Sequence, residues 1–539
     1  MGENVLVVSP TTLMLHTADP EVIHQVTARR EDFPKPTEHY KILAMFGRNI
    51  VTTEGAIWRM HRKVTSASFN EKNSALVFRA AIDQAQGMTN YWLQTQKNGS
   101  FHTVEHDTMS WALNIISYAG FGLNLLWPGQ SLPADADTRM VKYASFDPPA
   151  GHTLTFRESI SRVLKYLLPL LLTPTVILDN VPYSVFKQAK EARENYDQYM
   201  KEFIQEKIKD LRRGDKEIGM DIMGSLVAAA YQDNNQNKPG IRLDDSEIIG
   251  NAFIMFLAGH ETTANVMHFS MLELANNPAV QRRLQQDIDT ILGPNSDPAT
   301  WNYEEQVGPM QASMIGAVMN ETLRVLPPVV EVPKKTTPNK PQTIMVNGVS
   351  HVLPPNTYLG LCVTGSQRNP RCWPARPSKI TGAPDDLDDW VPERWFRPSI
   401  ESEKQGVDVP EDEDFGGYAG PDTSASMFRP VRGSFIPFSD GARSCLGRRI
   451  ALVELLAALA VVFQKYSIEN AVDEWATDDE VAGMTRPQKE AVYKKAVTKS
   501  REIIASAETR VTLKLHNGHH VPLRLVKRGE ERFVNWIDS

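Results

Sequence analysis

One cysteine in a glycine-bounded loop, residues 438–447 (FSDGARSCLG), constrains this chain more than any other feature. An apolar run of helical character, residues 448–456, follows Cys445 directly. Backbone N–H groups of such a loop and the start of a helix both favour a thiolate over a thiol. Gly441 permits a tight turn, and Gly447 permits the close approach of a flat ligand. The pattern therefore predicts a thiolate that is suited to bind haem iron.

The alternative interpretation is a buried structural cysteine beside a core helix, which is the usual environment of a lone cysteine. Arg443 adds positive charge that suits an acidic group of a cofactor.

Cys362 and Cys372 complete the cysteines of the chain, which are too few for a disulfide framework and include no Cys-x-x-Cys metal motif. The net charge of -7 does not suggest nucleic-acid binding. No run reaches the roughly 18 apolar residues that a membrane-spanning helix needs, and no signal peptide opens the chain.

Residues 438–447 resemble the haem-binding loop of the cytochrome P450 family, Phe-x-x-Gly-x-Arg-x-Cys-x-Gly, at every fixed position. The resemblance implies that Cys445 is the axial ligand of haem b and that Phe438, Arg443 and Gly447 contact the haem. It also implies a mainly α fold with small β-sheets, in which a long central helix crosses over the haem.

The sequence predicts that long helix at residues 244–275. Asp244 and Glu247 form a capping pattern at its start, and Pro278 marks its end. Residues 258–263 (AGHETT) place glycine and threonine where helices disfavour them, so that Gly259 leaves room for a ligand. A helix that tolerates one glycine is the alternative, and His260 has no predicted role as a ligand. The segment resembles the family's oxygen-activation motif, which implies that three of its residues face the haem or deliver protons to oxygen: Ala258, Glu261 and Thr262.

Two further motifs complete the candidate site. Trp58 and Arg62 share one face of a predicted helix and resemble the family's propionate clamp, although a surface Trp/Arg stack is the alternative. Glu321 and Arg324, followed by Arg394, resemble the family's buried ionic triad, which implies a structural role. Alone, the first two would be an ordinary pair on a solvated helix face.

Two positions differ from the family's pattern or match it loosely. Gln367 replaces a histidine that is usual in relatives, which removes the basis for a haem contact there. Lys334 or Lys335 lies near the position where relatives often carry an arginine that binds a haem propionate.

The remaining patterns predict the outline of the fold. Residues 5–8, 12–16, 343–346, 351–353 and 357–363 read as strands, and residues 75–122 and 184–213 as helices. Residues 166–178 are a core helix or, by resemblance, a lid that touches a membrane surface. Residues 511–515 and 521–525, on either side of Asn517-Gly518, predict a hairpin, which touches the substrate in relatives.

By resemblance the whole chain, residues 1–539, is a single catalytic domain with an acidic insertion at about residues 401–424. It is similar to fungal microsomal members, and by that resemblance we expect the given sequence to lack the N-terminal membrane anchor and to begin inside the fold. The implied function is a monooxygenase that hydroxylates or epoxidises a lipophilic small molecule in secondary metabolism. It would use O2 and electrons from NADPH through NADPH–cytochrome P450 reductase, at the cytoplasmic face of the endoplasmic reticulum and in peripheral contact with its membrane.

Two other functions remain open at this point. A haem-thiolate isomerase or dehydratase needs no reductase, but Glu261 and Thr262 argue against it because such enzymes can dispense with proton delivery. An inactive haem binder is the third possibility. Dependence of turnover on NADPH and the reductase separates the first two functions, and a failure to bind haem would favour an inactive protein.

Overall fold

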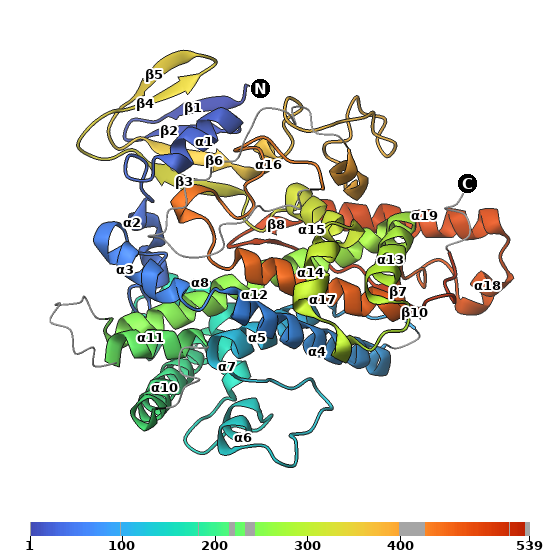
Figure 1. Ribbon diagram of the computed structural model, residues 1–539, viewed down its shortest axis with the longest axis horizontal. Coiled ribbons are helices and arrows are strands. Elements are labelled where there is room, and N and C mark those ends of the chain that lie inside the picture. Colours follow the sequence, from blue (N-terminus) through green and yellow to red (C-terminus); the bar gives the residue numbers. More distant parts are fainter. Residues whose placement is uncertain are drawn as a thin grey trace.

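The computed structural model describes residues 2–96, 99–181, 183–214, 221–231, 243–397, 426–516 and 518–533. Helices account for most of the described chain; some of the short strands gather near the N-terminus, and others lie among the helices of the C-terminal half (Figure 1). The predicted mainly α fold with small β-sheets is therefore confirmed. None of the described helices combines the length and the apolar content that crossing a bilayer requires.

The helices follow one another along the chain with few strands between them. Those of the N-terminal half are α1 (Pro20–Ala28), α2 (Thr37–Tyr40), η1 (Lys41–Ala44), α3 (Gly55–Ser66), α4 (Glu71–Thr95), α5 (Val104–Phe121), α6 (Thr138–Ala144), α7 (Phe156–Lys165), α8 (Leu167–Leu172), α9 (Thr175–Asn180), α10 (Ser184–Arg213), α11 (Ile222–Tyr231) and α12 (Asp245–Asn276). Those of the C-terminal half are α13 (Pro278–Leu292), η2 (Pro298–Thr300), α14 (Tyr303–Gln311), α15 (Met314–Val325), α16 (Val363–Ser366), η3 (Pro392–Phe396), η4 (Gly441–Arg443), α17 (Arg448–Lys465), α18 (Asp478–Gly483) and α19 (Arg486–Ala505).

The strands form one four-stranded sheet and several pairs. The sheet has the order β1 (Asn4–Val8), β2 (Leu13–Thr17), β6 (Tyr358–Cys362), β3 (Glu331–Lys335), and the pairs are β4 (Gln342–Val346) with β5 (Val349–Leu353), β7 (Tyr466–Asn470) with β10 (Leu523–Lys527), and β8 (Glu508–Thr509) with β9 (Leu513–Lys514). All of these pairs are antiparallel except β2 with β6.

Helix α12 is the central element of the fold (Figure 1). Asp244 caps it by accepting a hydrogen bond from the backbone of Glu247, whose carboxylate accepts one from the backbone N–H of Asp244 in return. Nearly all residues of α12 are buried, because it packs against α5, α15, α17 and α11. The helix predicted over 244–275 is therefore present, and the expected helix over 184–213 is α10, which ends at Gly214 in a left-handed conformation.

Two predictions for other segments were wrong or incomplete. Residues 511–515 and 521–525 do not form a hairpin with each other: β9 pairs with β8, while β10 pairs with β7, where Leu523 faces Asn470. Pro522, which lacks an N–H, precedes β10 and accepts a hydrogen bond from Ala471. Residues 166–178 form two short helices rather than one, α8 and α9, and their apolar side chains divide between the core and the surface. The predicted acidic insertion at about residues 401–424 lies outside the described residues.

Candidate active site

The cysteine loop is held in place by its own backbone and by α1. The N–H of Cys445 donates to the carbonyl of Phe438 at 2.9 Å, and the N–H of Ser444 donates to Gly441 at 2.9 Å. Gly441 adopts a φ of 67°, and a Cβ there would lie 2.5 Å from the backbone oxygen of Thr27. Glycine is therefore required at this position, both for its left-handed conformation and for the close approach of α1.

Cys445 itself is exposed, in contrast to its neighbour Leu446, which is buried. A Cβ on Gly447 would lie 3.9 Å from the Cys445 sulfur. Because residue 447 is glycine, no side chain from this position occupies the space next to the sulfur. A structural cysteine would be packed into the core. The exposure of the sulfur disagrees with that alternative and agrees with a ligand-binding thiolate at the start of α17.

Helix α3 lies against the cysteine loop through the two residues that the sequence singled out. Trp58 and Arg62 are both buried, which disagrees with a surface stack. The guanidinium of Arg443 lies 3.6 Å from the centre of the Trp58 ring, and Arg62 Nη1 donates to the carbonyl of Ser444 at 2.9 Å. Burial lowers the pKa of Arg62 to about 10, an effect that the nearby Cys445 opposes. The structure thus brings Trp58, Arg62, Arg443 and Cys445 together.

Positive charge exceeds negative charge around Arg443. Arg443 pairs with Glu54, yet its buried Nη1 has no hydrogen-bond partner among the described residues. Burial, reinforced by Arg443, lowers the pKa of Lys334 to about 8 and that of Lys35 to about 7. An anion placed among these groups would relieve their mutual repulsion. Sequence patterns gave no signal for Glu54 or Lys35, because their proximity to Arg443 arises only in the fold.

The structure separates the two candidate lysines of β3. Lys334 is buried and lies within electrostatic range of Arg443, whereas Lys335 pairs with Glu38 at 2.7 Å, and this hydrogen bond raises the pKa of Lys335. Gln367 is also buried but bonds to backbone: its amide donates to the carbonyls of Leu323 and Arg324 and accepts from the N–H of Ile436. Gln367 therefore links the end of α15 to the chain that leads into the cysteine loop.

We expect haem affinity to decrease by about tenfold between about pH 7 and about pH 9, because haem carboxylates would hold Lys334 and Lys35 in their charged forms. In the haem-free protein, each lysine has lost its proton above its lowered pKa. Haem binding must then be accompanied by the uptake of a proton, so the affinity for haem decreases as the pH rises. Below about pH 7 the lysines are already charged and the dependence levels off. The rate of haem transfer to excess apomyoglobin measures this effect.

Lys334→Met should weaken this pH dependence by about one proton, since the substitution removes one of the titrating groups. Lys335→Met is the matched control. Lys335 is paired with Glu38, so its replacement should leave the pH dependence of haem binding unchanged. An unaltered pH dependence in Lys334→Met would contradict the assignment.

The middle of α12 presents the second half of the candidate site. Ala258 is exposed and Thr262 is partly exposed within a helix that is otherwise almost entirely buried. Thr262 Oγ1 donates to the carbonyl of Ala258 at 2.8 Å, and Glu261 accepts from Lys514 at 2.6 Å. Leu257, next to Ala258, belongs to the same apolar cluster as Leu446, next to Cys445. The accessible parts of α12 and of the cysteine loop therefore border one apolar cluster.

Gly259 has a different role from the one that the sequence suggested. A Cβ on Gly259 would lie 2.8 Å from the Cδ1 atom of Ile116, so this glycine allows α5 to pack closely on α12 and does not open space for a ligand. His260 is buried with its Nδ1 atom 3.0 Å from the carbonyl of Phe256, which agrees with a structural role.

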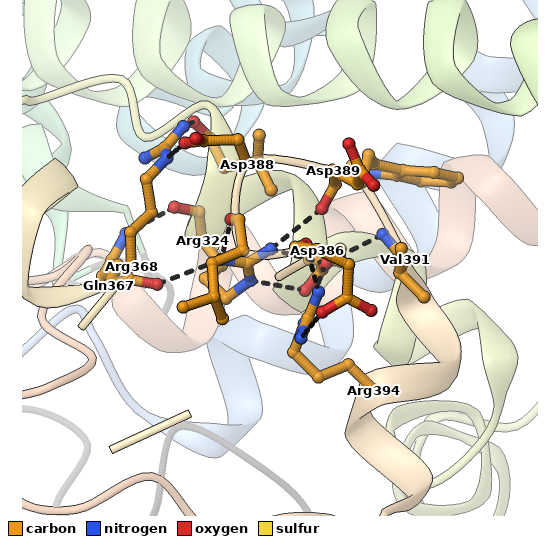
Figure 2. A network of polar contacts seen from close by, with 12 residues as sticks. Arg324, Gln367, Arg368, Asp386, Asp388, Asp389, Val391 and Arg394 are labelled. Atoms are coloured by element: carbon orange, nitrogen blue, oxygen red, sulfur yellow. Dashed lines mark hydrogen bonds and ion pairs between the residues drawn. The ribbon is translucent and has the colours of Figure 1, made fainter. Parts of the chain in front are cut away.

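Glu321, Arg324 and Arg394 form a fully buried network, and Figure 2 shows Arg324 and Arg394 within it. Arg324 donates to both carboxylate oxygens of Glu321 at 2.8 Å, and Arg394 Nε lies 3.4 Å from the same carboxylate. Arg394 also pairs with Asp386 at 2.8 Å, a partner that no sequence motif indicated. The guanidinium charges keep the pKa of Glu321 lowered in spite of its burial.

These residues fit a haem with two acidic groups. An accessible sulfur and an accessible helix face border one apolar cluster. Beside them lie buried cations, among them the Arg443 nitrogen that has no hydrogen-bond partner in the described part of the chain. Cys445 would hold the iron, and the cations of α3, β3 and the loop would hold the carboxylates: Arg62, Lys334 and Arg443.

Comparisons with known proteins agree with this description. A family model described as Cytochrome P450 matches residues 2–381 and 422–494. Cytochrome P450 monooxygenase 124 of Postia placenta is 30% identical over 85% of this chain and 76% of its own length. A cytochrome P450 monooxygenase of the phomenoic acid biosynthesis cluster of Leptosphaeria maculans is 24% identical over 84% of this chain and 73% of its own length. The crystal structure of the cytochrome P450DA heme domain superposes with a TM-score of 0.63 at 18% identity and covers 98% of this chain and 90% of its own.

Proposed function

We propose that this chain, which belongs to the cytochrome P450 family and is an enzyme of its monooxygenase class, hydroxylates or epoxidises a lipophilic small molecule. The observation that carries the proposal is that Cys445 is accessible and that α12 has an exposed Ala258 and a partly exposed Thr262, with the buried Glu261 next to Thr262. The Leptosphaeria relative and its biosynthetic cluster support a place in secondary metabolism. We also propose that residues 1–539 form one catalytic domain.

Each part of the site has a proposed task. When bound, haem supplies the activation of O2 and the transfer of one oxygen atom to the substrate. Cys445 binds the iron as a thiolate, while Phe438, Gly447 and Ala258 would provide the apolar contacts of the macrocycle. Thr262 and Glu261 pass protons from solvent toward the oxygen that becomes water. Apolar residues of α12 and the neighbouring helices exclude bulk water and orient the substrate.

The proposed electron source is NADPH, through NADPH–cytochrome P450 reductase. The sequence contains no flavin or nucleotide-phosphate motif, which agrees with an external reductase. Arg448 and Arg449, which are partly exposed at the start of α17, add positive charge beside the cysteine loop and would suit an acidic partner.

We further propose peripheral contact with the endoplasmic reticulum membrane at its cytoplasmic face. Large apolar side chains are exposed at β1 and around α8 and α9, among them Val8, Leu172, Val176 and Tyr183, each about 70% exposed. Apolar side chains exposed to this degree suit insertion into the interfacial region of a bilayer. Leu167 and Leu170, in contrast, are buried, so this segment contributes both to the core and to the proposed membrane contact.

Replacing Thr262 with alanine tests the proposed monooxygenase chemistry. Haem content should stay unchanged, while the fraction of NADPH electrons that is recovered as hydrogen peroxide should rise several-fold, because the hydroxyl that passes protons is lost. Peroxide and water yields per NADPH, with reductase and O2 present, measure the change.

Thr89→Ala is a matched control. Like Thr262, Thr89 donates its hydroxyl to the carbonyl four residues earlier, that of Ala85, at 2.8 Å, but it lies in α4 and outside the candidate site. An unchanged peroxide yield in Thr262→Ala would contradict the proton-transfer role. Turnover of a lipophilic substrate without NADPH and reductase would instead favour an isomerase or dehydratase.

A further inference from the structure

An ion pair joins the proposed acid of the proton pathway to the C-terminal part of the chain. Lys514 Nζ, on β9, donates to Glu261 Oε1 at 2.6 Å. The side chain of Lys514 is 27% exposed and that of Glu261 is 11% exposed, so the pair is largely shielded from solvent. Shielding and the short distance make this contact stronger than an ordinary surface pair.

A second contact ties the residue just before β9 to α12. Asn265, one helical turn after Glu261, donates to Thr512 Oγ1 at 3.0 Å. The N–H of Leu513, between the two contact residues, donates to the carbonyl of Pro328, which ties the segment to the end of α15. Lys514 is therefore held at Glu261 by the surrounding structure.

Lys514 also lies within electrostatic range of a second carboxylate, that of Glu105. Burial raises the pKa of Glu105, on α5; Lys514 lowers it, and Glu261 raises it. Without the ammonium group, the repulsion between Glu105 and Glu261 would no longer be offset by Lys514, and the Glu261 carboxylate would lose the hydrogen bond that orients it. The lysine thus supplies both the charge balance and the direction of the Glu261 side chain.

We propose that Lys514 is the positioning residue of the proton pathway: it holds the Glu261 carboxylate in the orientation from which protons pass to Thr262. This role rests on the monooxygenase function proposed above. Peroxide formation consumes two electrons and two protons per O2, whereas full reduction to two waters consumes four of each, with NADPH as the electron source. Proton supply through Glu261 therefore controls the ratio of peroxide to water.

Lys514→Met keeps the length of the side chain and removes its charge. With haem, NADPH, O2 and cytochrome P450 reductase, and no added substrate, the ratio of peroxide to water should rise about fivefold, which corresponds to about 1 kcal/mol. Lys514→Arg should restore most of the wild-type ratio because it retains the cation. Combining Lys514→Met with Glu261→Gln should add nothing to the effect of Glu261→Gln alone, since the lysine acts through that carboxylate.

A second measurement does not depend on turnover. Competitive acetylation with acetic anhydride, read by mass spectrometry, reports how strongly each ammonium group is engaged. Acetylation of Lys514 should be several-fold faster in Glu261→Gln than in the wild type, because the charged partner is lost. Equal rates in the two proteins would overturn the ion pair itself.

Lys142 provides a matched control, since it is 28% exposed and pairs with Glu202 and Glu206 at 2.9 Å away from α12. Lys142→Met should leave the peroxide ratio unchanged. If Glu261→Gln and Thr262→Ala raise the ratio but Lys514→Met does not, the positioning role is wrong and the monooxygenase proposal stands. If neither Glu261→Gln nor Thr262→Ala changes the ratio, the proton pathway and the role of Lys514 are both wrong.

Discussion

Replacing Cys445 with serine is expected to abolish the haem-thiolate absorption spectrum of the reduced, CO-bound protein. A serine hydroxyl stays protonated at neutral pH and cannot replace the anionic sulfur as an iron ligand. The loop favours the thiolate through the N-terminus of α17 and through Arg62, which lies within electrostatic range of Cys445. Monooxygenase turnover should be lost with the spectrum, because the electron-rich sulfur is what favours O–O cleavage.

The other cysteines provide the control for this experiment. Cys362 is partly buried and lies on β6, in the sheet rather than in the loop, so Cys362→Ser should retain the thiolate spectrum. If the thiolate spectrum persisted in Cys445→Ser but disappeared in Cys362→Ser, the iron ligand would be Cys362 and the assignment of Cys445 would be wrong. Retention of the spectrum in both variants would remove the basis of the proposed function.

The sequence predicted those parts of the fold that depend on local signals. Helix α12 was predicted because Asp244 and Glu247 form a reciprocal cap and because Pro278 cannot continue the helix. The end of α10 was predicted because Gly214 adopts a conformation that favours glycine. The family resemblance indicated Cys445 and the network of Glu321, and the structure places each in an environment that suits its expected role.

Contacts between distant segments could not be predicted in the same way. Residues 521–525 alternate in a manner that fits any antiparallel partner, and their true neighbour, β7, lies some 50 residues earlier in the chain. Lys514 and Lys35 are ordinary lysines in sequence; their significance arises from Glu261 and Arg443, to which the fold brings them. Gly259 matched a functional motif, yet the structure explains the glycine by the proximity of Ile116, which leaves little room for a side chain at position 259.

The network around Glu321 carries the second large effect that the structure predicts (Figure 2). All five N–H groups of Arg324 are used: three bonds go to the carbonyls of Gln367, Leu387 and Asp389, and two go to the Glu321 carboxylate. Glu321 also accepts from the N–H of Val391 at 2.9 Å and from the indole of Trp395 at 3.0 Å. The network thus joins α15 to the segment that leads toward the cysteine loop.

Glu321→Gln is therefore expected to destabilise the fold by about 3–5 kcal/mol, because it leaves the charge of the buried Arg324 without its carboxylate. Since folded proteins are stable by about 5–15 kcal/mol, little haem-loaded protein should accumulate. Arg394 is less affected because it retains Asp386. Because the pKa of Glu321 is lowered in the folded state, its contribution is present above the ordinary value of 4.5 and is lost as the pH falls through the lowered pKa.

Urea unfolding of Glu321→Gln and of Glu454→Gln tests whether the charge or the burial matters. Glu454, on α17, is equally buried, and burial raises its pKa to about 8, so at pH 7 it is mostly a neutral acid that glutamine imitates well. Glu454→Gln should therefore cost less than about 1 kcal/mol. Similar losses in the two variants would mean that any polar change in these helices is equally disruptive. A loss confined to Glu321→Gln assigns the effect to the buried ion pair, because the two substitutions differ chiefly in the charge that they remove.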